Sequence, residues 1–175
     1  RTPDGTPYRA SDPELLRWVH ATAMFGFMEA YHRFVAPLTA AQSNQFVAEG
    51  VPAAQLYGAI NPPASETELR QLFTTTLPAL EPSEIIVEFL GIMHRLPLFP
   101  WFARPLGTRL VRAAIACLPD DVRDTLDLGG TPSLSAFDAW MIMRLGREMD
   151  RLPLATMPSG HACLRLGLPG DWLRP

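Results

Sequence analysis

Proline is the feature that most constrains how this chain can fold. Eighteen of its 175 residues are prolines, roughly twice the usual share of ~5%. Because proline has a fixed φ and no backbone N–H, it interrupts helix interiors and central strands. We therefore expect short, sharply bounded segments and few long continuous helices.

Between these breaks, apolar residues recur at helical spacing, and no segment combines strict alternation over five or more residues with flanking turn chemistry. We predict an all-α fold, with residues 1–175 forming one domain of about six to eight short-to-medium helices. Ser11 and Glu14 have the spacing of a capping box around Pro13, so a helix should run from there to about Val35. The other predicted helical segments are 45–49, capped by Thr39 and stopped by Gly50, then 52–58, 65–76, 83–95, 106–118, a short turn after Pro119, and 135–150; the tail after Pro153 is predicted to be irregular.

Charge and cysteine usage exclude several classes of protein. The chain carries 15 basic and 18 acidic residues, a formal net charge of −3, so it lacks the positive excess of a nucleic-acid-binding protein. All 15 cations are arginine, which excludes lysine nucleophiles and Schiff bases. Cys117 and Cys163 form no CxxC pair, so neither a disulfide framework nor a Cys-rich zinc site is indicated. No apolar run reaches the ~20 residues of a membrane span, and we expect a soluble or membrane-peripheral protein, in the cytoplasm or at a membrane surface.

His20 is the candidate functional residue of the first predicted helix. At 100° per residue it falls within an apolar stripe and should point inward. The other members of that stripe are Leu16, Ala23, Phe27, Ala30 and Phe34. Leu16 and Met24, one turn away on either side, favour a neutral imidazole with an available nitrogen. The alternative is a core histidine held by a backbone carbonyl.

The other histidines carry weaker signals. Glu29 and His32 match the Glu-x-x-His pattern of di-iron bundles, but no second copy exists, so we interpret them as a solvated pair. His94 and His161 are expected to be exposed or capping. We find no G-x-S-x-G, P-loop, G-x-G-x-x-G or H-E-x-x-H motif.

Residues 96–118 suggest an interfacial surface. This stretch combines aromatic residues with arginines, namely Phe99, Trp101, Phe102, Arg104, Arg109 and Arg112. Such a mixture is compatible with contact to a membrane surface or a partner. A core helix with solvated arginines is the alternative.

One string of residues is typical of a known family. It comprises Pro3-Asp4-Gly5, Tyr8, Asp12-Pro13 and Trp18-Val19-His20-Ala21-Thr22. Together these residues resemble the family of latex-clearing rubber oxygenases and the mycophenolic-acid-pathway oxygenase, many of whose members are uncharacterised bacterial proteins. Weaker matches continue through Ala30-Tyr31, Pro63 to Leu69, and Leu118-Pro119 with Arg123.

The resemblance implies an all-α protein that holds haem b and uses O₂ to oxidise a hydrophobic small molecule or polymer bearing an alkene. It places the axial histidine upstream of Arg1 and makes His20, Trp18 and Thr22 pocket residues, with Met24 and Phe27 beside them on the same helix. His20 is the fallback ligand. We expect this chain to be the C-terminal part of a longer oxygenase-like domain, inactive and cofactor-free alone, with an uncovered apolar face that favours homo-oligomers. A helical binding or interaction domain without cofactor is the alternative function.

Overall fold

The computed structural model describes residue 5 and residues 9–95, 104–151, 158–170 and 172. These residues form eight α-helices and one 3₁₀ helix and contain no strand, which confirms the all-α prediction. The elements are α1 (Pro13–Phe34), α2 (Ala40–Leu56), α3 (Glu66–Thr76), η1 (Leu77–Ala79), α4 (Glu84–Arg95), α5 (Arg104–Cys117), α6 (Asp120–Thr125), α7 (Ala136–Asp150) and α8 (Pro158–Arg165).

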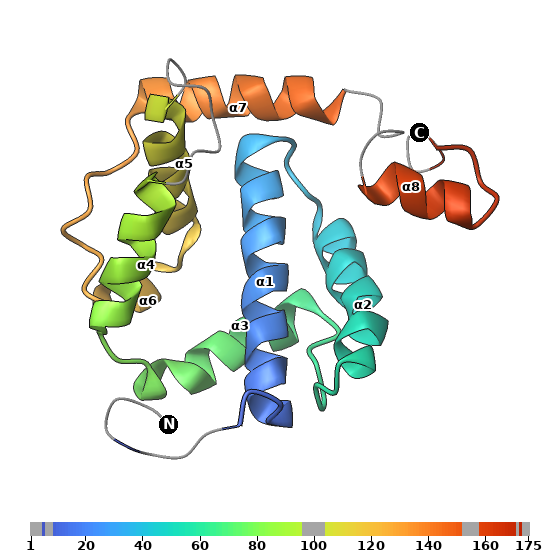
Figure 1. Cartoon of the computed structure of the whole chain (residues 1–175), viewed down its shortest axis with the longest axis horizontal. Coiled ribbons are helices and arrows are strands. Elements are labelled where there is room, and N and C mark those ends of the chain that lie inside the picture. The colour runs from blue at the N-terminus through green and yellow to red at the C-terminus, as the bar shows by residue number, and fades with distance from the viewer. Residues whose placement is uncertain (1–4, 6–8, 96–103, 152–157, 171, 173–175) are drawn as a thin grey trace.

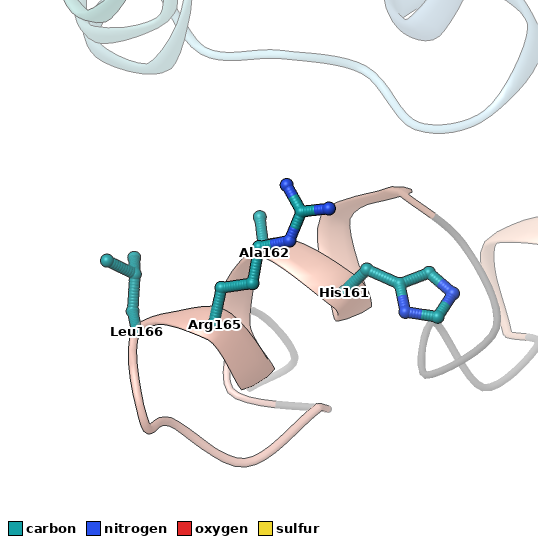
Figure 2. A pocket seen from close by; sticks show the side chains of 4 residues that line it. All are labelled: His161, Ala162, Arg165 and Leu166. Atoms are coloured by element: carbon teal, nitrogen blue, oxygen red, sulfur yellow. The ribbon is translucent and has the colours of Figure 1, made fainter.

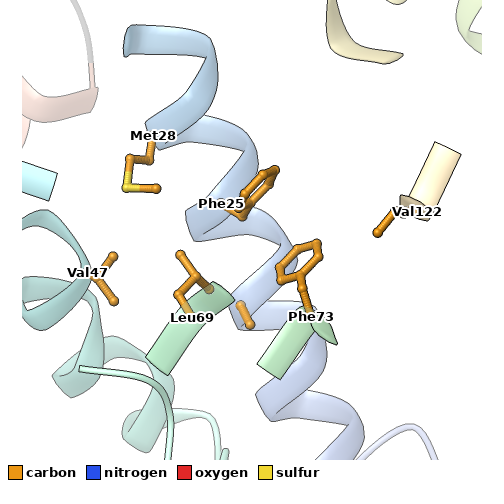
Figure 3. Packing of buried hydrophobic residues seen from close by; sticks show 7 residues of the cluster. Phe25, Met28, Val47, Leu69, Phe73 and Val122 are labelled. Carbon is orange, nitrogen blue, oxygen red and sulfur yellow. The ribbon is translucent and has the colours of Figure 1, made fainter. Parts of the chain in front are cut away.

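Helix α1 is the central element of the fold (Figure 1). It contacts α2, α3, α5 and α7, while α4 packs on α5. Helix α2 lies on one side of α1 and the α4–α5 pair on the other, and α7 lies across the end of α1 (Figure 1). The main core joins α1 to α2, α3 and α6 (Figure 3); its buried members are Ala21, Phe25, Met28, Val47, Leu69, Phe73 and Val122. A second, smaller cluster of Val111, Ile115 and Leu128 lies on the α5 side.

Polar side chains cap the N-termini of α1, α2, α3 and α7. Asp12 caps α1, since its side chain accepts hydrogen bonds from the backbone N–H of Glu14 and Leu15; the capping box predicted on Ser11 is wrong by one residue. Asp12 is equally suited to this role, and the following proline takes the first helical position. Thr39 caps α2, as the sequence predicts, and Ser65 and Ser135 cap α3 and α7.

Helix α2 corrects the expectation of a break at residue 50. It runs for 17 residues through both Gly50 and Pro52, so neither residue stops it. A Cβ added at position 50 would lie 2.7 Å from Met24 Cε. Gly50 therefore allows α2 to approach α1 closely. The stabilisation from this packing outweighs the loss of the backbone hydrogen bond that Pro52 cannot donate. With the 22 residues of α1, the fold contains longer helices than its proline content predicts.

The later segments follow the predicted pattern except in the tail. Helices α4, α5, α6 and α7 lie where periodicity placed them. Helix α8 forms in the tail that was expected to be irregular, so that prediction is wrong there. Residues 96–103 of the predicted interfacial stretch lie outside the described residues. Among the helices that the structure describes, none combines the length and the apolar character that a membrane crossing requires.

Candidate functional site

Helix α1 carries two buried polar side chains, His20 and Glu29. Their exposed fractions are 6% and 8%, and the inward orientation of His20 is confirmed. The predicted inward stripe is wrong further along the helix, because Ala23 and Phe27 are exposed. The main core instead receives Ala21, Phe25 and Met28. His20 lies at the margin of the buried face, where α2 covers it.

The His20 ring is enclosed by α2 and by its own helix. An added Cβ at Gly50 would lie 3.2 Å from His20 Cε1, and the Tyr57 ring centroid is 6.0 Å from that of His20. His20 Nε2 is buried and has no hydrogen-bond partner among the described residues. Burial lowers the pKa of His20, so the imidazole is neutral at pH 7. The site thus holds a neutral ring with one uncommitted nitrogen.

The other predicted pocket residues point in different directions. Trp18 packs on Phe73 of α3, with ring centroids 5.0 Å apart. The Thr22 hydroxyl donates a hydrogen bond to the Val19 carbonyl at 2.9 Å. Met24 lies against Gly50 beside His20, whereas Phe27 is 69% exposed. The fold therefore brings His20 and Met24 together and separates them from the other three.

Glu29 is the centre of an ion-pair network, which corrects its interpretation as half of a solvated pair. Its two carboxylate oxygens accept from Arg33 Nε at 3.1 Å and from Arg70 at 2.8 Å. Arg70 also binds Glu66 at 2.7 Å and lies over the Phe25 ring. Arg33 in turn donates to the Ala116 carbonyl. Glu29 thereby connects α1 directly to α3, and through Arg33 to α5.

A polar cavity lies beside this network. Its volume is about 380 Å³, and it is lined from α1, α2 and α3 by Glu29, His32, Arg33, Ser43, Glu66 and Arg70 together with Met28, Leu38 and Ala40. His32 is exposed, as expected, and its Nδ1 accepts a hydrogen bond from the Leu38 N–H at 2.9 Å. Sequence reasoning missed this cavity; its one local signal is the i,i+4 spacing of Glu29 and Arg33.

The remaining histidines are exposed, as predicted. His94 lies in the last turn of α4. His161 lies on α8, where it lines a surface cavity of about 690 Å³ together with Ala162, Arg165 and Leu166 (Figure 2). All four residues come from α8 and the turn that follows it. Within the described ranges, no three His, Cys, Asp or Glu residues gather in a way that could hold a metal ion.

Residues 1–149 match the family model described as ER-bound oxygenase mpaB/B′/rubber oxygenase, catalytic domain. The chain belongs to this family. The match covers α1 through nearly all of α7, so both His20 and Glu29 lie within the mpaB/rubber oxygenase domain. Searches among curated proteins and among solved structures find no match.

Proposed function

We propose that this protein, in its full-length form, is an oxygenase that uses haem b to oxidise an apolar substrate. Membership of an oxygenase catalytic-domain family supports the reaction class. The single observation that supports haem is the buried, unpartnered Nε2 of His20. A buried polar atom without a partner is costly, and a cofactor bound against this wall would supply the missing hydrogen bond.

The fit of His20 to haem is only partial. The nitrogen is available, but Met24 and the Gly50 backbone close around the ring, and a macrocycle needs an open slot between helices. We therefore assign His20 to the wall of the haem site and not to the iron. Bound haem would supply the iron that activates O₂.

The side chains around His20 limit what it can do. Because burial lowers its pKa, the imidazole stays neutral and can accept or donate one hydrogen bond at Nε2. Met24 and Leu16 keep the surroundings apolar, so a hydrogen bond formed there is strong. His20 would therefore act as a positioning residue: its Nε2 would form one hydrogen bond with a polar atom of a group bound against this wall of the haem site.

The test is the Soret absorption band of the full-length protein during haemin titration, recorded beside the 175-residue chain. We expect His20→Ala to weaken or shift the band, and the matched exposed variant His32→Ala to leave it unchanged. Equal effects of both variants would contradict the role of His20. A band in the 175-residue chain as well would make His20 the leading axial ligand.

The packing of Gly50 on His20 favours a second function, a helical binding domain without cofactor. In that case His20 is a structural residue of the α1–α2 contact. No Soret band would then appear at either chain length. His20→Ala would only lower the free energy of unfolding, by ~1–3 kcal/mol, through the cavity it leaves.

A further inference from the structure

An apolar groove runs between α4 and α5, on the opposite side of α1 from α2 (Figure 1). Its volume is about 500 Å³, within the ~300–1,000 Å³ typical of small-molecule sites. Helix α4 contributes Ile86, Phe89, Leu90 and Met93, and the other wall includes Leu110, Val111, Ala114, Ile115, Leu126 and Leu128. All the lining side chains are apolar, so the groove can receive a hydrocarbon but offers no side-chain partner for a polar group.

A second, polar cavity of about 210 Å³ adjoins this groove. Ile115 lines both cavities, and Leu128 of the groove is followed directly by Gly129 of the polar cavity. The polar cavity is lined by two guanidinium groups and two hydroxyl groups, those of Arg112, Arg123, Thr131 and Ser133, and by no carboxylate. This set of donors suits an anion.

The two guanidinium groups of the polar cavity differ in their ion pairs. Arg109 of α5 is ion-paired with Asp138 at 2.6 Å, and Arg123 is ion-paired with Asp120 at 2.6 Å. Arg112 has no ion pair among the described residues, although its charge contributes to lowering the pKa of Asp138 after the larger effects of Ser135 and Arg109. One cation therefore remains for a ligand at the end of an apolar groove.

We propose that these two adjoining cavities bind a single-chain amphiphile with a carboxylate head, a long-chain fatty acid, with the chain in the α4–α5 groove and the head on Arg112. The arginine fork matches a carboxylate in geometry as well as charge. Phe89 is 56% exposed, so the groove is open to a ligand from solvent. This site is separate from His20 and does not depend on the haem proposal.

The test is calorimetric titration of the folded chain with dodecanoate below its micelle concentration, beside octanoate and the uncharged 1-dodecanol. We expect saturable binding of dodecanoate, weakening roughly fourfold for each methylene removed. We expect 1-dodecanol to bind at least tenfold more weakly. Arg112→Gln should weaken dodecanoate roughly ten- to hundredfold and leave 1-dodecanol unchanged, while Arg144→Gln on α7 should change neither.

The groove itself is tested by placing a carboxylate in it. Phe89→Asp should abolish binding of both ligands, whereas Val87→Asp should not, since Val87 is an exposed residue of the same helix outside the groove. If circular dichroism shows that Phe89→Asp is unfolded, Ala114→Phe, at an exposed position, fills the groove instead. Equal affinity for dodecanoate and 1-dodecanol, binding only to phosphatidylglycerol vesicles, or a self-associated chain that excludes dodecanoate would each overturn the proposal.

Discussion

His20 and Glu29 lie nine residues apart on α1 and are almost equally hidden from solvent, yet their surroundings differ. Glu29 satisfies both carboxylate oxygens with arginines from two helices. His20 leaves Nε2 without a partner. Burial of a polar group is stabilising only when its hydrogen bonds are made. The Glu29 end of α1 therefore gains stability from its hydrogen bonds, while the His20 end leaves one buried nitrogen without a hydrogen bond.

The helix crossings at the two ends differ in the same way. Both α2 and α7 approach α1 through a glycine. At Gly50 an added Cβ would meet the flexible end of Met24, at 2.7 Å from Cε. At Gly146 the added Cβ would lie 2.6 Å from the Phe34 backbone oxygen. A backbone atom cannot move away by a change of side-chain rotamer. The contact near His20 can thus adjust, and the contact at the C-terminal end of α1 cannot.

Removal of the Glu29 carboxylate should have the largest effect. Glu29→Ala breaks two charge-assisted hydrogen bonds that connect α1 with Arg33 and Arg70. Both arginines are nearly half exposed, with side-chain exposures of 44% and 49%, so water can solvate them once the carboxylate is gone. We expect the free energy of unfolding to fall by about 2–3 kcal/mol, measured by urea denaturation at pH 7.5.

The control for this prediction is Glu49→Ala. Glu49 is exposed, and within the described part of the chain its carboxylate accepts one hydrogen bond, from Gln45 on its own helix. Its loss should change the free energy of unfolding by less than ~0.5 kcal/mol. Similar values for the two variants would show that the network contributes little, and the contrast between the two ends of α1 would then fail.

A substitution at Gly146 should have the next largest effect. Gly146→Ala forces a Cβ against the Phe34 carbonyl and should destabilise the fold by about 1–2 kcal/mol, despite the better helix propensity of alanine. At Gly26, also inside a helix, an added Cβ meets no atom within 4 Å. Gly26→Ala should therefore stabilise by up to ~1 kcal/mol. Thermal melts of both variants check the signs, and a stabilised Gly146→Ala would disprove the rigid crossing.

The sequence predicted those features that depend on neighbours within one turn. The cap of Thr39 on α2 is local, and it was assigned correctly. The inward orientation of His20 also followed from the helical period, which places it within an apolar stripe. Periodicity predicted, however, that the whole apolar stripe of α1 points inward. Helix α2 covers only the first part of that stripe, and Phe27 is exposed.

The features that sequence reasoning missed depend on contacts between distant residues. Arg70 lies 41 positions after Glu29, and no local pattern in the sequence predicts that ion pair. Gly50 was interpreted as a helix stop because the sequence alone does not distinguish a glycine that a helix crossing requires from a glycine that ends a helix. Arg112 of α5 and Arg123 of α6 line one cavity with Thr131 and Ser133, and no local pattern in the sequence predicts this set.

The smallest effect, and the most specific to the His20 end, is a pH dependence. Burial lowers the folded-state pKa of His20 below its ordinary value of 6.5, so above pH 6.5 neither folded nor unfolded chains hold this proton. As the pH falls below that value, the unfolded chain binds the proton first, and the free energy of unfolding decreases until the folded-state pKa is passed. One proton gives a slope of at most ~1.4 kcal/mol per pH unit.

His20→Leu should remove this slope in urea titrations between pH 7.5 and 5, whereas His32→Leu should keep it. A slope that survives in His20→Leu would come from other groups, so the pKa of His20 would not be lowered by burial, and this contrast with Glu29 would be lost.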